Sequence, residues 1–103
     1  MSYVYCIRNT KTRRVKLGKG NNPLKRLKTL QTGSADPLVL EGTIQTDEPF
    51  RVEKTLHRIF GAYRVKGEWF DIAERDERLL QVIFRKIEAT AHETEALIRL
   101  GVW

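Results

Sequence analysis

The sequence predicts a small α/β (α+β) domain, in which a three-stranded antiparallel sheet is flanked by helices. Runs of strand-forming residues alternate with stretches whose apolar residues recur at helical spacing. The 103 residues, 41% of them hydrophobic, suffice for one domain with a modest core. No apolar run approaches the roughly 18 residues that cross a bilayer, so we expect no membrane partner. The single cysteine, Cys6, forms no disulfide framework and favours a reduced, cytoplasmic setting.

The first two strands are predicted to form a hairpin. Residues 3–8 are rich in Tyr, Val and Ile, which favour strands. Residues 9–12 supply turn chemistry, and residues 13–17 return as the second strand. Residues 18–21, Gly-Lys-Gly-Asn, are predicted to be a flexible loop that leads into the first helix.

The first helix is expected to begin after Asn22, which can cap it, with Pro23 in its first position. Gly33 is expected to end the helix in a left-handed conformation. The apolar stripe of this helix consists of three leucines at helical spacing: Leu24, Leu27 and Leu30.

The rest of the chain supplies one more strand and two helices. Residues 38–46 alternate as a third strand, and a second helix is predicted from about 47 to 60. Residues 67–71 form a short extended segment whose aromatic residues close the core. We predict a core of residues 1–72 and a long helical extension, 73–103, that packs on the core or on a partner chain as a homodimer. Its apolar stripe is predicted to contain Leu79, Val82, Ile83 and Ile87, with either Leu80 or Phe84 as an optional further member.

The positive charge is concentrated in the first part of the chain. The net charge is +6, but residues 1–72 hold 14 basic and 7 acidic groups (+7), while residues 73–103 hold 5 and 6 (−1). Residues 3–30 contain nine Lys or Arg and no Asp or Glu. This distribution indicates a polyanion such as nucleic acid as partner. A solubilising charged surface is the alternative.

Several short motifs occur in a characteristic order. Tyr3-Val4-Tyr5 is followed, eleven residues after Tyr5, by Lys16-Leu17-Gly18, and Arg26 comes eight residues after Gly18. Glu53 lies within EKTLHRIF, and GEWF occupies residues 67–70. Together these motifs, over about residues 3–72, resemble the GIY-YIG nuclease superfamily, and the last two resemble a branch found in phage and bacterial proteins. The resemblance implies the same α/β architecture and an endonuclease that hydrolyses DNA phosphodiester bonds with Mg²⁺ or Mn²⁺. RNA is left open as a substrate.

The resemblance also implies roles for individual residues. Glu53 matches the metal-binding glutamate, and Arg26 matches the catalytic arginine, whose guanidinium can clamp a phosphate. Tyr5 matches the tyrosine of the first tripeptide and could orient the attacking water. It could act as a base only if surrounding cations lowered its pKa.

Two further residues complete the predicted catalytic set. Lys16 stands where the superfamily usually has a second tyrosine, and it would act either as a base or as a charge that stabilises the transition state. His57 lies one helical turn from Glu53 and could orient water, pass a proton to the leaving oxygen, hold Glu53, or serve only in packing. Direct nucleic-acid contacts are assigned to five basic residues: Arg8, Arg14, Lys19, Lys25 and Lys28.

The remaining alternatives concern activity and the GEWF segment. A nucleic-acid-binding module without turnover is the second hypothesis, favoured by Lys16 and opposed by Glu53 and Arg26. Trp69 is expected to close the core with Phe70, with base stacking as the alternative. Glu68 is expected either to support the site indirectly or to bond Arg64.

Overall fold

The structure is a computed structural model that describes residues 1–85. Its elements follow one another as β1 (Tyr3–Asn9), β2 (Val15–Gly20), α1 (Pro23–Thr32), β3 (Leu38–Gln45), α2 (Pro49–Ile59), the 3₁₀ turn η1 (Gly61–Tyr63), β4 (Arg64–Lys66), β5 (Trp69–Phe70) and α3 (Glu74–Arg85). This composition confirms the predicted α+β class.

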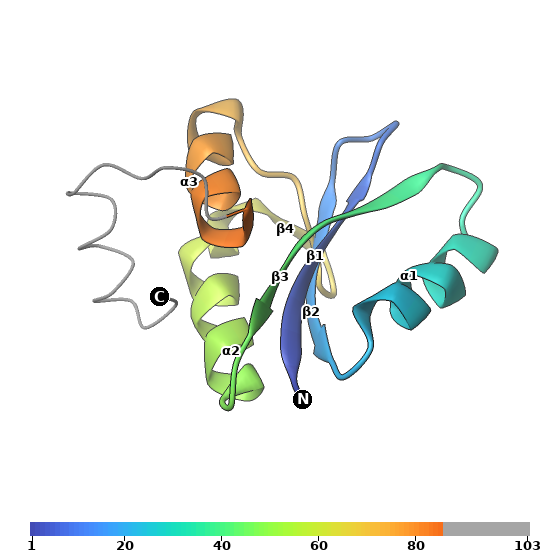
Figure 1. Cartoon of the computed structure of the whole chain (residues 1–103). Helices are drawn as coiled ribbons and strands as arrows, with labels where there is room; N and C mark the ends of the chain where they lie inside the picture. Colours follow the sequence, from blue (N-terminus) through green and yellow to red (C-terminus); the bar gives the residue numbers. More distant parts are fainter. Residues whose placement is uncertain (86–103) are drawn as a thin grey trace.

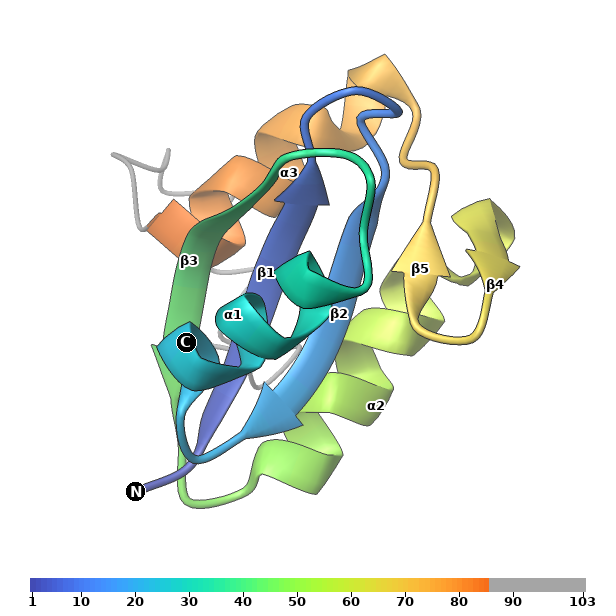
Figure 2. The ribbon, with the colours of Figure 1, turned by 90° about the vertical axis from the view of Figure 1, so that its right-hand side faces the viewer.

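The sheet has five antiparallel strands rather than the three that we predicted, in the order β3-β1-β2-β5-β4. The two additional strands, β4 and β5, span three and two residues. β5 falls within the extended segment predicted at residues 67–71, but strands of two and three residues are too short for a sequence pattern to show that they pair in the sheet. Together they form a small hairpin beside one end of β2 (Figure 2).

The helices cover the two faces of the sheet unequally. α1 lies on one face, while α2 and α3 lie on the other (Figures 1 and 2). The larger core cluster lies on the side of α2 and α3 and includes Val4, Leu17, Leu56, Phe70 and Ile83.

On the face of α1, the smaller cluster is built on Tyr5, Ile7 and Leu38, with Leu27 and Leu30 packed against it. Leu24, which we expected in the stripe, is 64% exposed because the first turn of α1 extends beyond this cluster.

The ends of α1 agree with the prediction at one end only. The Asn22 side chain accepts a hydrogen bond of 3.1 Å from the N–H of Lys25, which confirms the N-cap. Gly33, however, has φ −92° and is not left-handed, so the predicted type of C-cap was wrong. The predicted loop of residues 18–21 was also wrong, because β2 runs through Gly20 in register with β1.

α3 occupies the first part of the predicted long helix, and it is described over 12 residues. Of its predicted stripe, Val82 and Ile83 are buried in the core and Leu79 packs against it half-buried. Leu80 and Phe84, the two optional members, are both buried. Ile87, and the rest of the extension to residue 103, lie outside the described residues.

Arg8 belongs to the interior, which contradicts its predicted contact with nucleic acid. Its side chain is 1% exposed, its Nε lies 2.7 Å from Glu41 Oε1, and its two terminal nitrogens lie 2.8 and 2.9 Å from the Glu77 carboxylate. Burial alone would lower the pKa of Arg8, but hydrogen bonds to Glu77 and Glu41 outweigh it and raise the pKa. Arg8 therefore ties β1 to β3 and α3.

We expect Arg8→Ala to lower the free energy of unfolding by about 3 kcal/mol. The substitution would remove the buried guanidinium that pairs with the carboxylates of Glu41 and Glu77. Urea denaturation followed by circular dichroism measures this change. Arg8→Lys keeps the charge but loses the forked geometry, so it should fall between the wild type and Arg8→Ala. If Arg8→Ala left the stability unchanged and weakened DNA binding, Arg8 would contact nucleic acid after all.

Candidate active site

The candidate site lies at the open edge of β2. β5 pairs with β2 only at Val15 and Lys16, and the Leu17 N–H donates a 3.0 Å hydrogen bond to the Glu68 carbonyl. Among the described strands, none pairs with this side of β2 beyond that point. Groups from the α1 face and from the α2 face can therefore approach one another past the edge.

Tyr5 lies at the centre of the site because Gly18 leaves room for it. The two residues are directly paired across β1 and β2, and Tyr5 is 2% exposed. A Cβ atom on residue 18 would lie 2.5 Å from the Tyr5 hydroxyl oxygen and 2.7 Å from the ring carbon that carries it. Since Cβ atoms do not approach other atoms this closely, only glycine allows the tyrosine to keep this position.

Gly18→Ala should therefore displace the Tyr5 hydroxyl and reduce about 100-fold the nicking of DNA that the GIY-YIG resemblance predicts, the usual effect of a displacement of about 1 Å in an active site. Single-turnover nicking rates test this expectation. Gly20→Ala is the matched control, because a Cβ there would approach the Tyr5 ring only to 4.0 Å, an ordinary van der Waals distance. A Gly18→Ala protein with wild-type rates would show that the position of Tyr5 does not matter.

Arg26 approaches Tyr5 from α1. Its guanidinium lies near enough to the Tyr5 hydroxyl to lower the pKa of Tyr5. Burial raises the pKa of Tyr5 above its ordinary value and outweighs these lowering effects of Arg26, while the charges of Glu68 and Glu53 raise it further. The condition for Tyr5 to act as a base is therefore not met, and its hydroxyl stays protonated at neutral pH.

Glu53 reaches the site from α2. The residue is 9% exposed, and its Oε1 lies 3.6 Å from Lys19 Nζ. Its other oxygen, Oε2, is buried and has no hydrogen-bond partner. Burial and the charge of Glu68 raise the pKa of Glu53, and the positive charge of Lys19 only partly offsets them. A buried carboxylate oxygen without a partner costs free energy, which suggests that it serves a ligand.

Glu68 joins the site from the turn between β4 and β5. Its Oε1 lies 3.1 Å from Lys16 Nζ, and Lys16 is 8% exposed. Glu68 pairs with Lys16, whereas Arg64, the partner that we had considered for it, contacts His57. Trp69 is half-buried against the smaller cluster and lies under Lys16, whose Nζ is 5.9 Å from its ring centroid. Phe70 is fully buried, which confirms its role in the core.

His57 is held by both of its ring nitrogens. Its Nε2 lies 2.7 Å from the Leu17 carbonyl oxygen, and its Nδ1 lies 3.0 Å from an Arg64 terminal nitrogen. This pairing assigns the proton to Nε2, which donates to the carbonyl, while Nδ1 accepts from Arg64. The bond to Leu17 anchors α2 to the open edge of β2. Of the roles predicted for His57, this geometry favours holding the site together.

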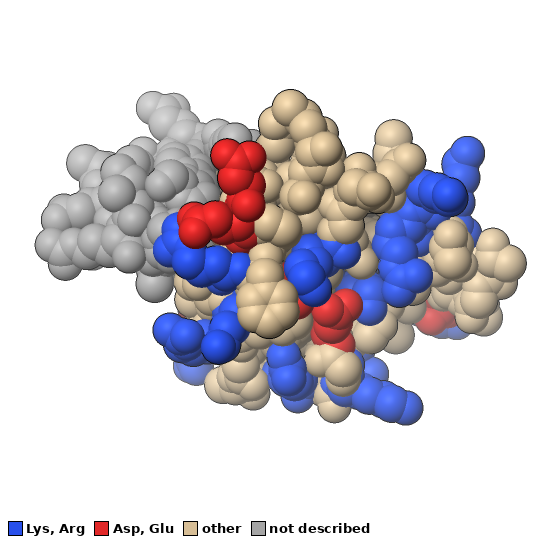
Figure 3. Space-filling view, turned by 90° about the horizontal axis from the view of Figure 1, so that it is seen from below, with Lys and Arg blue, Asp and Glu red and all other residues tan. Residues whose placement is uncertain are grey.

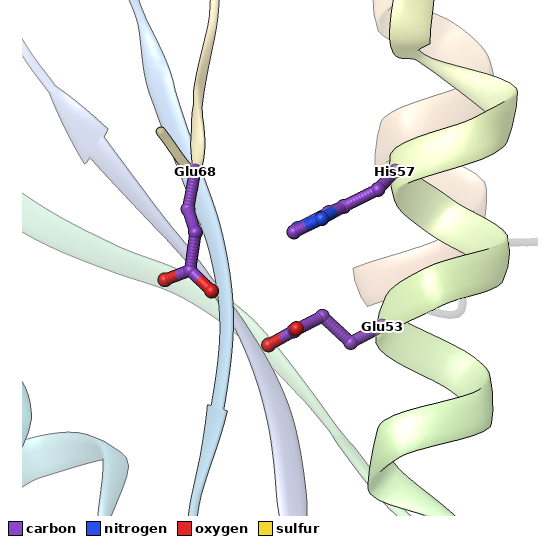
Figure 4. Close-up of side chains that lie close together, drawn as sticks. All are labelled: Glu53, His57 and Glu68. Atoms are coloured by element: carbon purple, nitrogen blue, oxygen red, sulfur yellow. The ribbon is translucent and has the colours of Figure 1, made fainter. Parts of the chain in front are cut away.

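The potential metal-binding groups face one another. Glu53, His57 and Glu68 each offer a ligand atom, and these atoms lie within 4.8 Å of one another. Figure 4 shows Glu53 and His57 projecting from α2 toward Glu68. Glu68 was expected only to support the site indirectly, because nothing in its spacing from Glu53 marks the two as neighbours. The only signal was its place in the GEWF motif.

The predicted DNA contacts fall into two groups. Lys19, Lys25 and Arg26 line an open pocket at the start of α1, and Lys28 is exposed further along this helix. Arg14 is exposed at the β1–β2 turn, at the other end of β2 from Lys19. Figure 3 shows Lys and Arg side chains gathered on the lower face of the molecule, around a few acidic ones. Of these basic groups, Lys19 is the one whose ammonium lies near a carboxylate of the site, 3.6 Å from Glu53 Oε1.

Comparison with known proteins supplies a family match. Residues 2–88 match the model of the T5orf172 domain. No curated protein and no solved structure matches the chain. Among the described helices, none is both long and apolar enough to span a bilayer.

Proposed function

The chain belongs to the T5orf172 domain family, a GIY-YIG-related and nuclease-like family, and from this premise we propose that it is a divalent-metal-dependent endonuclease acting on DNA. The observation that carries the proposal is the unbonded, buried Oε2 of Glu53, in a site that also contains Arg26 and Tyr5. A surface that only binds phosphates gains nothing from a buried carboxylate, because its charge repels the backbone.

The donor atoms of the site fit a hard cation. Carboxylate oxygens are the ligands that Mg²⁺ and Mn²⁺ prefer, and Mg²⁺ is commonly held by one or two carboxylates together with substrate phosphate. Glu53 would hold the ion. Such a cation, when bound, would polarise phosphate oxygens and acidify water, and it could also stabilise the charge on the leaving oxygen.

The basic residues bind the phosphate group. Arg26 donates paired N–H bonds to the oxygens of the scissile phosphate, a geometry that a guanidinium provides and an ammonium does not. Lys19 and Lys25, which line the same pocket, hold the neighbouring backbone. The charge that develops on the phosphoryl oxygens during in-line attack is thereby neutralised by groups already in place.

The remaining residues orient the reactants. Tyr5, whose pKa is raised, donates its hydroxyl proton as a hydrogen bond to the phosphate or to the attacking water. Lys16 is an ammonium paired with Glu68, which favours its electrostatic role over that of a base. His57 keeps α2 against β2 and so fixes the position of Glu53.

The test is nicking of supercoiled plasmid by the purified protein. We expect nicking with Mg²⁺ or Mn²⁺ and its loss when EDTA removes the metal. The second candidate, a module that binds nucleic acid without cleaving it, is favoured by Lys16 in place of a tyrosine. DNA binding without cleavage, over a broad range of pH and divalent metals, would establish that alternative and end the nuclease proposal.

A further inference from the structure

We infer that Glu68 is a second metal ligand, so that Glu53 and Glu68 form a two-carboxylate site for a hard divalent cation from which His57 is excluded. The inference rests on the proposed function and extends it, because it gives the GEWF segment a direct part in the site. Two carboxylates from distant parts of the chain make a more specific cation site than one.

The first argument is the meeting of two carboxylates from separate elements. Glu53 projects from α2 and Glu68 from the β4–β5 turn, and their ligand atoms lie within 4.8 Å of each other (Figure 4). Two negative groups at this separation repel unless a proton or a cation lies with them. The fold brings these two residues together from positions 15 residues apart in the sequence, where a bound cation would relieve their repulsion.

The second argument is the incomplete bonding of Glu53. The residue is nine-tenths buried, and its Oε2 has no hydrogen-bond partner. Lys19 approaches Oε1 only to 3.6 Å, which is too long for a hydrogen bond. The Glu53 carboxylate therefore has an oxygen free to bind a ligand. Its side chain points toward Glu68 (Figure 4).

The position of Glu68 is fixed by the backbone on both sides. Its carbonyl accepts the Leu17 N–H at 3.0 Å, which holds it to the edge of β2. Gly67 precedes it with φ +56°, a conformation that favours glycine and sets the direction of the turn. Lys16 contacts Oε1 of Glu68 at 3.1 Å and offsets part of the negative charge of the pair. The carboxylate is therefore placed before any ligand arrives.

His57 does not belong to the ligand set, although it is close enough. Its Nε2 carries the proton given to the Leu17 carbonyl, and its Nδ1 accepts from Arg64. Ligation would require it to break one of these bonds, whereas neither carboxylate has to give up a hydrogen bond to the backbone. A site of oxygen ligands alone selects Mg²⁺ or Mn²⁺ over Zn²⁺, which favours nitrogen and sulfur.

The test measures binding of Mn²⁺ to the full chain without DNA, by isothermal titration calorimetry and by the electron paramagnetic resonance of free Mn²⁺. We expect Glu53→Gln and Glu68→Gln each to weaken Mn²⁺ binding at least about tenfold, as the loss of a ligand does. Glu48→Gln is the control, because Glu48 is an exposed acid next to α2 whose carboxylate pairs with Arg51, and the substitution should leave binding unchanged.

Lys16→Met separates ligation from simple ion pairing. It keeps both carboxylates and removes the competing cation, so we expect Mn²⁺ binding equal to or tighter than that of the wild type. If Lys16→Met weakens binding as much as Glu68→Gln, Glu68 acts only through Lys16 and the inference is wrong. Circular dichroism of each variant checks that the fold is retained.

The outcomes distinguish this inference from the proposed function. Wild-type Mn²⁺ binding by Glu68→Gln, with binding lost in Glu53→Gln, would overturn the role of Glu68 and leave the nuclease proposal intact. Metal-dependent nicking by a protein that binds no Mn²⁺ without DNA would also overturn the two-carboxylate site alone. Absence of both Mn²⁺ binding and nicking would end both proposals.

Discussion

Glu53→Gln should abolish metal-dependent nicking, with a loss of at least about 1,000-fold, while DNA affinity stays close to that of the wild type. The glutamine has the same size but no negative charge, so it cannot hold a divalent cation. Several kcal/mol of transition-state stabilisation depend on that cation, and each 1.4 kcal/mol corresponds to about tenfold in rate. Affinity survives because the phosphates are bound by the basic residues around the site.

The experiment compares single-turnover nicking rates and DNA binding for the wild type, Glu53→Gln and the exposed control Glu48→Gln. Because Glu53 Oε2 has no partner to lose, the substitution should not lower stability, and an inactive variant would not be explained by unfolding. Nicking by Glu53→Gln at a rate near that of the wild type would exclude this residue as the metal ligand.

The central part of the fold was predictable because its signals are local. The β1–β2 hairpin, the cap at Asn22 and the alternation of β3 each depend on residues close together in the sequence. The loop predicted at residues 18–21 failed for a specific reason. Two glycines in four residues indicate a turn, but Gly18 lies within a strand because it makes room for the ring of Tyr5.

The errors concern contacts between distant residues. The sequence shows that Arg8 is basic but not that Glu41 and Glu77, 33 and 69 residues away, enclose it. Its positive charge alone therefore predicted a surface position for Arg8, whereas its side chain lies in the interior. Glu68 is the converse case, because only the antiparallel pairing of β5 with β2 brings it to Lys16 and opposite Glu53.

The location of the site also depends on something that no motif states. α1 and α2 lie on opposite faces of the sheet (Figures 1 and 2). If the sheet continued beyond the whole length of β2, it would separate Arg26 from Glu53. They act on the same Tyr5 hydroxyl because β5 covers only the first part of β2. The shortness of β5, which hid its pairing from the sequence pattern, is what leaves the edge open.

Arg26→Ala is expected to reduce the nicking rate about 1,000-fold, in the range found for arginines that neutralise a transferring phosphoryl group. DNA affinity should fall far less, because Lys19, Lys25 and Lys28 remain. Arg26→Lys should recover only part of the rate, since a lysine restores the charge but not the paired N–H donors. Nicking under saturating protein and binding at several salt concentrations separate the two effects.

The matched control is Arg58→Ala, which removes an exposed arginine from α2 that has no part in the proposed site. It should leave the nicking rate unchanged, whereas Arg26→Ala lowers it at every salt concentration. Electrostatic affinity falls steeply with salt, so a contribution of Arg26 to binding alone would disappear when the protein is saturating. Full recovery of the rate under saturation would therefore contradict a catalytic role for Arg26, because the transition state would form equally well without its guanidinium.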